Sequence, residues 1–168
     1  MADFSHSRNN NLVKPKIYTE DNHSIKKHDI DKNALFVLEK LRSAGFTAYL
    51  VGGGVRDLLL KKTPKDFDIS TSARPEQVRR VFKHCFLIGK RFRLAHVRFG
   101  KKVIEVATFR SGNIDEEELI TRDNNWGSPE EDALRRDFTI NGLFYDSDKG
   151  SIIDYFGGVD DLQQHLLK

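Results

Sequence analysis

The segment 65–69 constrains this chain more than any other stretch, because two acidic residues alternate there with two apolar ones. Alternation with a period of two is typical of a β-strand that buries one face. Side chains at positions i and i+2 of a strand point to the same side. We therefore expect Asp66 and Asp68 to stand side by side, with Phe67 and Ile69 in the core.

An aspartate pair of this kind is a candidate metal site. Two like charges about 6–7 Å apart repel by roughly 3 kcal/mol at an effective dielectric constant near 20. A cation between them removes the repulsion, and Mg²⁺ is the ion that suits paired carboxylates and phosphate groups. Two such ions can clamp the attacking and leaving oxygens of a phosphoryl displacement. An isolated Asp-x-Asp more often marks a solvated strand edge, so the neighbouring motifs decide between the two interpretations.

Three consecutive glycines form a second motif. Gly52, Gly53 and Gly54 follow a short apolar strand at 49–51, and Arg56 comes just after them. Backbone N–H groups at such a strand–turn–helix junction can cradle phosphate, and an arginine adds a planar fork that matches it. The G-x-G-x-x-G spacing of a dinucleotide site is absent, and a purely structural turn is equally compatible with the pattern.

A third acidic candidate lies in a predicted hairpin, whose strands cover 94–99 and 103–109. Glu105 is an acid in a strand that otherwise looks buried, and buried acids are paired or bound to metal. It can be a third carboxylate beside the aspartate pair. It can instead form an ion pair with one of three nearby arginines, Arg91, Arg93 or Arg98.

A strong helix start precedes the last motif. Ser128 and Glu131 have the spacing of a capping box, with a proline at the first helical position. We expect the helix to turn Ala133 and Leu134 inward. It leads into a charged stretch at 135–141.

Two arginines and an acid open this stretch. Arg135 or Arg136 can contact the phosphates or ribose of a nucleotide, with Asp137 orienting it. The same charges can equally be a structural ion-pair network, because charge clusters serve both roles.

Composition indicates one domain in a reducing compartment. The chain has 168 residues, a formal charge of +3 and one cysteine, Cys85, which cannot form an internal disulfide. We interpret residues 1–28 as a disordered or loosely attached polar tail and 29–168 as a globular α/β (α+β) domain. A helix is expected from about 29 to 44, and a mobile acidic loop from 111 to 126. No apolar run reaches membrane-spanning length, so a cytoplasmic location is expected.

Three stretches in this order, 50–57, 65–68 and 135–141, resemble the head domain of the class II nucleotidyltransferases. That family comprises bacterial poly(A) polymerases and CCA-adding tRNA nucleotidyltransferases. The stretches 87–97, 104–110 and 122–124 are more similar to the poly(A) polymerase branch. The resemblance covers residues 29–168 and implies a mixed β-sheet flanked by helices.

The resemblance also implies roles for individual residues. Asp66 and Asp68 would hold Mg²⁺, as two ions for which Mn²⁺ can substitute, and Asp137 would be a further acidic residue of the active site. The residues implied to contact the nucleoside triphosphate are Gly53, Arg56 and Arg136. Two departures stand out: Lys61 occupies a position where relatives often have glycine, and the neck that would follow the head is missing.

The function implied is template-independent transfer of AMP from ATP to an RNA 3′ end. CCA addition to tRNA is the first alternative, because the neck residues that select the base are absent. A non-catalytic head that binds nucleotide or RNA is the second, and we expect this chain alone to be weak or inactive. Nothing in the sequence indicates a membrane or a particular protein partner.

Overall fold

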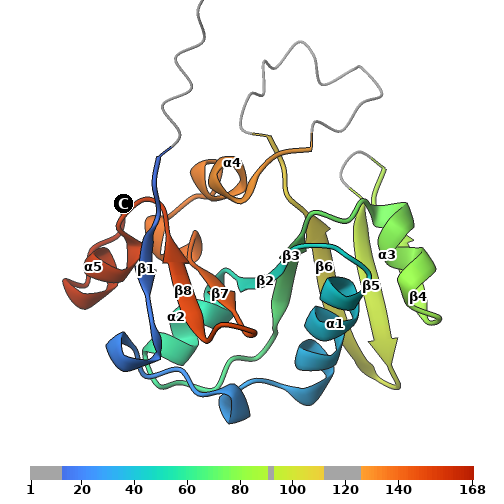
Figure 1. The fold of residues 1–168 in the computed structure, drawn as a ribbon, viewed down its shortest axis with the longest axis horizontal. Helices are drawn as coiled ribbons and strands as arrows, with labels where there is room; N and C mark the ends of the chain where they lie inside the picture. The colour runs from blue at the N-terminus through green and yellow to red at the C-terminus, as the bar shows by residue number, and fades with distance from the viewer. Residues whose placement is uncertain (1–12, 91–92, 112–125) are drawn as a thin grey trace, which may run out of the picture.

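A mixed β-sheet organises the fold of the computed structural model, which describes residues 13–90, 93–111 and 126–168 (Figure 1). The described residues form eight strands in the order β1-β8-β7-β2-β3-β6-β5-β4. Neighbouring strands are antiparallel except for β3 and β6, which are parallel. The strands are β1 (Lys16–Tyr18), β2 (Ala48–Val51), β3 (Asp68–Thr71), β4 (Cys85–Ile88), β5 (Leu94–Phe99), β6 (Lys102–Thr108), β7 (Phe144–Asp146) and β8 (Ser151–Asp154). The predicted mixed sheet flanked by helices is confirmed.

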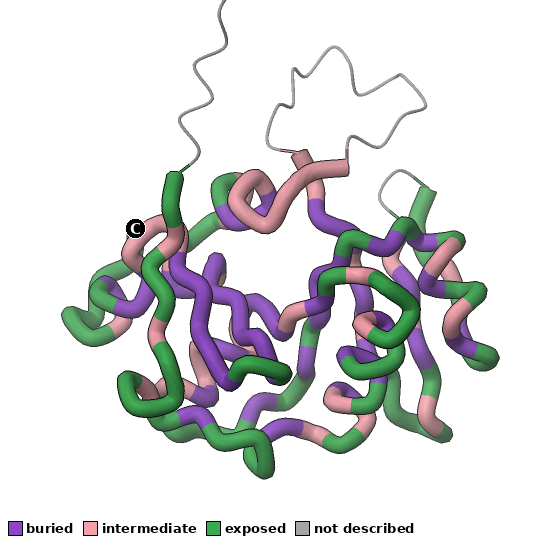
Figure 2. The backbone as a smooth tube through the Cα atoms, viewed as in Figure 1, coloured by how far each residue is buried: buried purple, intermediate pink, exposed green. Residues whose placement is uncertain are grey.

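Five α-helices of the described residues flank this sheet: α1 (Lys32–Ser43), α2 (Gly53–Leu59), α3 (Pro75–Val81), α4 (Pro129–Leu134) and α5 (Gly158–Gln163). All of them except α4 contribute buried side chains to the main core. Leu38 and Leu41 of α1 pack in one cluster with Ile69 of β3 and Ile104 of β6, all at most 1% exposed. Figure 2 shows buried residues along the central strands and at intervals along the helices.

A smaller aromatic cluster lies on the opposite face of the sheet. Phe144 of β7 and Phe109 meet edge to face, with ring centroids 6.0 Å apart. Val51 of β2 and Ala133 of α4 complete the cluster together with Ile153. Val51 and Phe144 occupy opposite positions on β2 and β7, and Ala133 packs in the same cluster, so α4 lies over this part of the sheet.

Local sequence signals explain where the main helix begins and ends. The Asp31 carboxylate accepts hydrogen bonds from the backbone N–H groups of Asn33 and Ala34, which caps α1 within the stretch predicted to be helical. Gly45, with φ of +92°, ends it because glycine adopts this left-handed conformation without a steric penalty.

The predicted tail is largely part of the fold. Residues 1–12 lie outside the described residues, but β1 pairs in register with β8, Ile17 lying opposite Ile153. Ile25 is 2% exposed and belongs to the main core. The interpretation of residues 13–28 as loosely attached is therefore wrong, because one strand pairing and one buried side chain anchor them. Composition alone hides both contacts.

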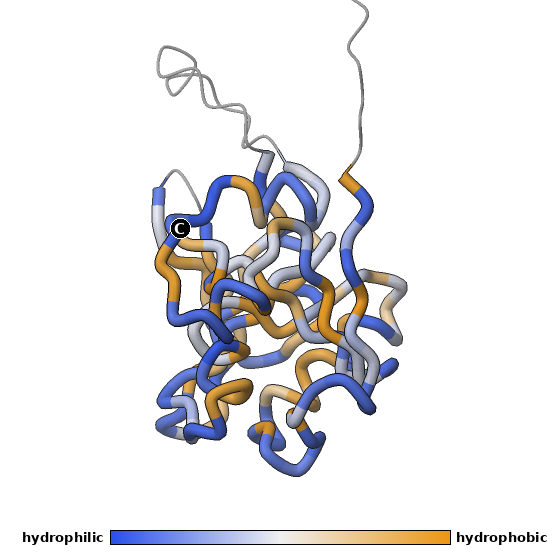
Figure 3. Tube along the Cα trace, turned by 90° about the vertical axis from the view of Figure 1, so that its left-hand side faces the viewer, coloured by the Kyte–Doolittle hydropathy of each residue, from blue (hydrophilic) through white to orange (hydrophobic). Residues whose placement is uncertain are grey.

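Two further expectations need correction, and one lies beyond the described residues. Leu134 was expected to face inward with Ala133, yet it is 63% exposed, because α4 ends there and the chain turns away. The helix after the glycines begins at Gly53 itself, so two of the three glycines are helical. The acidic loop predicted at 111–126 falls almost entirely outside the described residues. Figure 3 shows hydrophobic segments in the interior and hydrophilic turns outside.

Among the described residues, no helix is both long and apolar enough to cross a membrane. Cys85 is 8% exposed and packs in the main core, as expected of a small core residue. Its burial raises the pKa of the thiol, which disfavours the reactive thiolate at neutral pH.

Candidate active site

Asp68 of β3 and Glu105 of β6 form an acidic row on the sheet face that carries α4. Phe67 and Ile69 are buried at 8% and 0% exposure, whereas Asp66 and Asp68 are exposed, which matches the predicted alternation. Strand β3 begins at Asp68, so Asp66 lies two residues before it. In the parallel pairing of β3 with β6, Asp68 stands directly opposite Glu105.

The charges in this row affect the ionisation of Asp68. Its pKa is raised, first because surrounding atoms displace water from the carboxylate, and then because Glu105 and Asp66 repel the charged form. Arg136 acts in the opposite direction and lowers this pKa. The three acids therefore share one electrostatic site, and Arg136 is its nearby positive charge.

Glu105 lies near both another carboxylate and a basic side chain, so it has features of the two roles predicted for it. It lies beside Asp68, and its own carboxylate is 3.6 Å from Nε2 of His96, its cross-strand neighbour on β5. Its face of β6 is half-exposed, whereas Ile104 and Val106 point to the core, so the strand does not bury Glu105 as expected.

The arginines proposed as partners of Glu105 are engaged elsewhere or lie outside the described residues. Arg93 forms an ion pair with Glu76 at 3.2 Å. Arg98 lies over the ring of Phe86, 5.3 Å from its centroid. Arg91 is outside the described residues.

The glycine turn packs directly against the acidic segment. Gly52 has φ of +77°, which reverses the chain between β2 and α2 without strain only for glycine. A Cβ atom on Gly54 would lie 3.2 Å from the carbonyl oxygen of Asp66. Glycine at this position therefore permits the close approach of α2 to the segment that carries the aspartates.

Arg56 of α2 is held from two sides. Its Nε and Nη2 both donate to Oδ1 of Asp57 at 3.1 Å, and its Nη1 donates to Oδ1 of Asn141 at 3.0 Å. The Asn141 amide also donates to Asp137, at 3.3 Å. The predicted Arg56 and Asp137 are thus linked through Asn141, a residue to which the sequence analysis gave no role.

Arg136 connects α4 to the face of the sheet. Its Nη2 donates to Oδ2 of Asp132 at 3.0 Å and lies 3.4 Å from the Ser70 hydroxyl on β3. A Cβ atom on Gly52 would lie 3.7 Å from its Nη1. Ser70 and Asp68 share one face of β3 because they are two residues apart. Arg136 is therefore placed between the glycine turn and the acidic row.

Asp132 holds the arginines in the role that the sequence analysis suggested for Asp137. Its carboxylate is fully buried and pairs with Arg135 at 3.1 Å and with Arg136. It also accepts the backbone N–H of Arg110 at 3.1 Å. The i, i+3 and i+4 spacing from Asp132 to the two arginines was the available signal.

A capping box fixes the start of the short helix that carries Asp132. Ser128 accepts the N–H of Glu131 at 3.3 Å, and the Glu131 side chain accepts the N–H of Ser128 at 2.7 Å. The predicted capping box is confirmed, and it explains why a helix of only six residues has a defined start.

The acidic row fits a hard divalent cation by the chemistry of its donors. Within the described ranges, no group of three or more His, Cys, Asp or Glu side chains is already arranged as a metal site. Carboxylate oxygens are nevertheless the ligands that Mg²⁺ prefers, and a bound cation would relieve the repulsion that, after burial, contributes to the raised pKa of Asp68.

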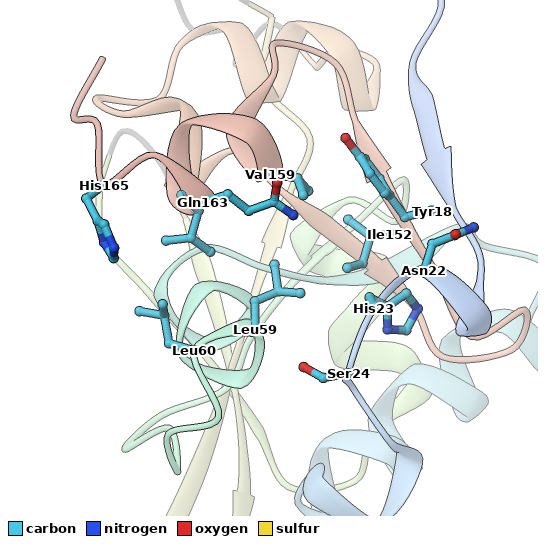
Figure 4. A pocket seen from close by; sticks show the side chains of 11 residues that line it. Tyr18, Asn22, His23, Ser24, Leu59, Leu60, Ile152, Val159, Gln163 and His165 are labelled. Carbon is cyan, nitrogen blue, oxygen red and sulfur yellow. The ribbon is translucent and has the colours of Figure 1, made fainter.

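A pocket of about 320 Å³ lies apart from this acidic row (Figure 4). Its floor is apolar, with Leu59 of α2, Ile152 of β8 and Val159 of α5, and its rim carries His23 and Gln163. None of the candidate site residues lines this pocket, so the pocket and the acidic row are separate sites.

Comparison with known proteins identifies this combination of fold and motifs. The family model described as "Poly A polymerase head domain" matches residues 48–168. Poly(A) polymerase I of Salmonella typhi is 52% identical over 163 residues, which cover 90% of this chain and 35% of that protein. The CC-adding tRNA nucleotidyltransferase of Halalkalibacterium halodurans is 39% identical over 140 residues, covering 83% of this chain and 33% of that protein.

A solved structure supports the same assignment. The CCA-adding enzyme of Bacillus stearothermophilus, in complex with CTP, superposes with a TM-score of 0.69 at 37% identity, covering 80% of this chain and 32% of that one. The chain spans about a third of the length of the relatives it matches. It belongs to the family of poly(A) polymerase head domains, which are nucleotidyltransferases related to the CCA-adding enzymes.

Proposed function

We propose that this chain is the nucleotide-binding and catalytic head of an enzyme that transfers AMP from ATP to an RNA 3′ end without a template. The observation that carries the proposal is the position of Arg136, between the glycine turn at Gly52 and the acidic row that begins at Asp68. Phosphate-binding groups and metal-binding groups are adjacent there, as phosphoryl transfer requires.

The acidic residues would hold the metal. Asp66 and Asp68 are assigned as ligands of two Mg²⁺ ions, for which Mn²⁺ can substitute, with Glu105 as the third carboxylate beside them. When bound, the ions supply Lewis acidity that favours ionisation of the RNA 3′-hydroxyl and neutralises charge on the departing pyrophosphate.

The basic residues would hold and orient the triphosphate. Gly53 at the start of α2 presents backbone N–H groups, and Arg56 and Arg136 present guanidinium forks for phosphate oxygens. Because Asp57, Asn141 and Asp132 fix these forks in advance, less side-chain entropy is lost on binding. Asp137 is assigned a supporting role in the site through its hydrogen bond to Asn141.

The test is nucleotide transfer in a form extended to the length of the relatives, with labelled ATP and an unstructured RNA. Asp68→Asn is expected to lower the rate by about 10³-fold or more, since losing a metal ligand removes several kcal/mol of transition-state stabilisation. Glu39→Gln, an exposed acid on α1, is the matched control. Near-unchanged transfer by Asp68→Asn would defeat the metal assignment.

CCA addition is the competing activity, favoured by the CCA-adding enzyme with bound CTP among the structural matches. The higher identity to poly(A) polymerase I supports ATP as the only nucleotide. Supplying ATP and CTP separately, on tRNA and on unstructured RNA, distinguishes the two. Efficient CTP incorporation restricted to tRNA would replace our proposal with the competing one.

The 168-residue chain alone serves as a separate test of the binding-only alternative. We expect metal-dependent binding of an ATP analogue, with weak and non-processive transfer. Robust tailing by the 168-residue chain alone would contradict this expectation. The proposal keeps the predicted cytoplasmic location, where ATP and RNA are available and the thiol of Cys85 stays reduced.

A further inference from the structure

Among the described residues, one half of the sheet face that carries the acidic row exposes its side chains. In the register of β4, β5, β6 and β3, four residues occupy directly opposite positions and form one row: Phe86, His96, Glu105 and Asp68. Neighbouring strands are about 4.8 Å apart, so Phe86 lies roughly 15 Å from Asp68 along the sheet. Directly opposite residues share a face, so this row leads straight from Phe86 to the acids.

The exposed half carries large apolar side chains. Phe86 and Ile88 of β4 are 53% and 48% exposed, and Val103 of β6 is 37% exposed. On the opposite face of β5, Ala95 and Val97 are at most 2% exposed and belong to the core that α1 and α3 cover. The sheet is therefore closed on one side and apolar but accessible on the other, which is typical of a binding surface.

Positive charge accompanies these apolar groups. Arg98, the neighbour of Val103 across β5 and β6, lies 5.3 Å from the centroid of the Phe86 ring. Lys101 is exposed in the turn that joins the two strands. An aromatic ring for base stacking beside guanidinium and ammonium groups for phosphate is the combination that binds single-stranded nucleic acid.

We propose that Phe86, Ile88, Arg98 and Val103 form a docking surface for the few nucleotides that precede the 3′ end of a single-stranded RNA. This surface rests on the proposed adenylyl transfer, because the row of opposite residues delivers the RNA end to Asp68 and Glu105. A base stacks on Phe86, and Arg98 contacts the phosphate next to it. The chain then contributes RNA affinity within the head itself.

The experiment measures binding of a labelled oligoadenylate to the 168-residue chain by fluorescence anisotropy, at several salt concentrations. Phe86→Ala is expected to weaken binding at least fivefold, the lower range for loss of a stacking platform. Arg98→Ala is expected to weaken it and to reduce the salt slope by about one, while Arg98→Lys keeps the slope. Circular dichroism confirms that each variant is folded.

Matched controls lie on the covered side of the sheet. Phe36 of α1 is 45% exposed and Arg80 of α3 is exposed, so Phe36→Ala and Arg80→Ala remove the same chemistry elsewhere. Both are expected to leave RNA binding unchanged. Equal losses in these controls and in the surface variants would overturn the proposal, since they would indicate a non-specific effect.

The outcomes separate this surface from the function on which it rests. Binding of an ATP analogue is expected to be unchanged in Phe86→Ala. If the unchanged chain binds RNA but no ATP analogue, the proposed function fails while the surface stands. Wild-type RNA affinity in Phe86→Ala and Arg98→Ala overturns the surface alone, as does an unchanged chain that binds no RNA. Loss of self-association in Phe86→Ala with RNA affinity intact would assign the face to a second copy and overturn the RNA proposal.

Discussion

Asp68 and Glu105 stand directly opposite each other on β3 and β6, the parallel pair of strands in the described sheet. Charged groups of like sign in this position destabilise a sheet. Their repulsion is one reason why the pKa of Asp68 is raised. The head domain therefore carries in its free state an unfavourable interaction that the proposed cation would remove, and such an arrangement trades stability against function.

The first prediction concerns stability without metal. Asp68→Asn keeps the shape of the side chain and removes one charge, so it is expected to stabilise the chain at pH 7 by about 0.5 kcal/mol, within the range for cross-strand pairs. Urea unfolding in the presence of a chelator measures this, with Glu39→Gln as the control. A variant less stable than the unchanged chain at pH 7 would contradict the repulsion. Added Mg²⁺ is expected to stabilise the unchanged chain more than the variant.

The pH dependence of this difference has a definite sign. Because the pKa of Asp68 is raised in the folded state above the ordinary 3.8, the folded chain binds the proton more tightly than the unfolded chain. The contribution of Asp68 to stability is therefore largest at low pH and declines as pH rises from about 3.8 through the raised value. The advantage of Asp68→Asn should be absent at low pH and present above this window, and a reversed trend would refute the assignment.

The second prediction concerns the buried acid that holds the arginines. Asp132→Asn leaves Arg135 and Arg136 without their buried counter-charge, so it is expected to cost about 3 kcal/mol of unfolding free energy. Binding of an ATP analogue should weaken as well, because Arg136 is no longer fixed beside the glycine turn. The exposed carboxylate of Asp160 lies 3.9 Å from Nζ of Lys16, so Asp160→Asn should change the free energy of unfolding by less than about 1 kcal/mol. Equal effects of the two changes would remove Asp132 from its anchoring role.

The third prediction uses two adjacent glycines as a matched pair. In Gly54→Ala the new Cβ meets the backbone carbonyl of Asp66 at 3.2 Å, whereas in Gly53→Ala it meets only the flexible Arg56 side chain, at 3.1 Å. Both positions gain helix propensity of up to about 1 kcal/mol. We expect Gly53→Ala to keep or raise stability, and Gly54→Ala to shift the acidic segment and weaken Mg²⁺ binding. Calorimetry with Mg²⁺ measures this, and equal metal binding by both variants would contradict the expectation.

The fourth prediction concerns the amide that joins two predicted site residues. Asn141→Ala removes the hydrogen bonds to Arg56 and Asp137, so Arg56 loses one of its two supports. The expected effect is about a fivefold loss of affinity for an ATP analogue, since one such hydrogen bond contributes roughly 1 kcal/mol. Asn33→Ala on α1 is the control for the loss of an amide elsewhere. Full affinity in Asn141→Ala would show that Asp57 alone positions the guanidinium.

Some features of this protein are encoded in short stretches of sequence. The alternation around Phe67, the capping box at Ser128 and the helix start at Asp31 each depend on residues within a few positions of one another. Local backbone geometry fixes which of these side chains share a face or meet a backbone N–H group. Such signals therefore predict the helix starts and the alternating burial of this segment, although the strand itself begins only at Asp68.

Tertiary structure alone decided how these pieces meet. The register of β3 with β6 brings Asp68 to Glu105, 37 positions apart in numbering, and packing of α4 on the sheet brings Arg136 to Ser70. The edge pairing of β1 likewise anchors a segment that looks like a tail by composition. These contacts depend on burial and strand order across the whole domain, which no local pattern encodes. The sequence therefore identified the candidate acids, whereas the tertiary structure determined which residues lie beside them.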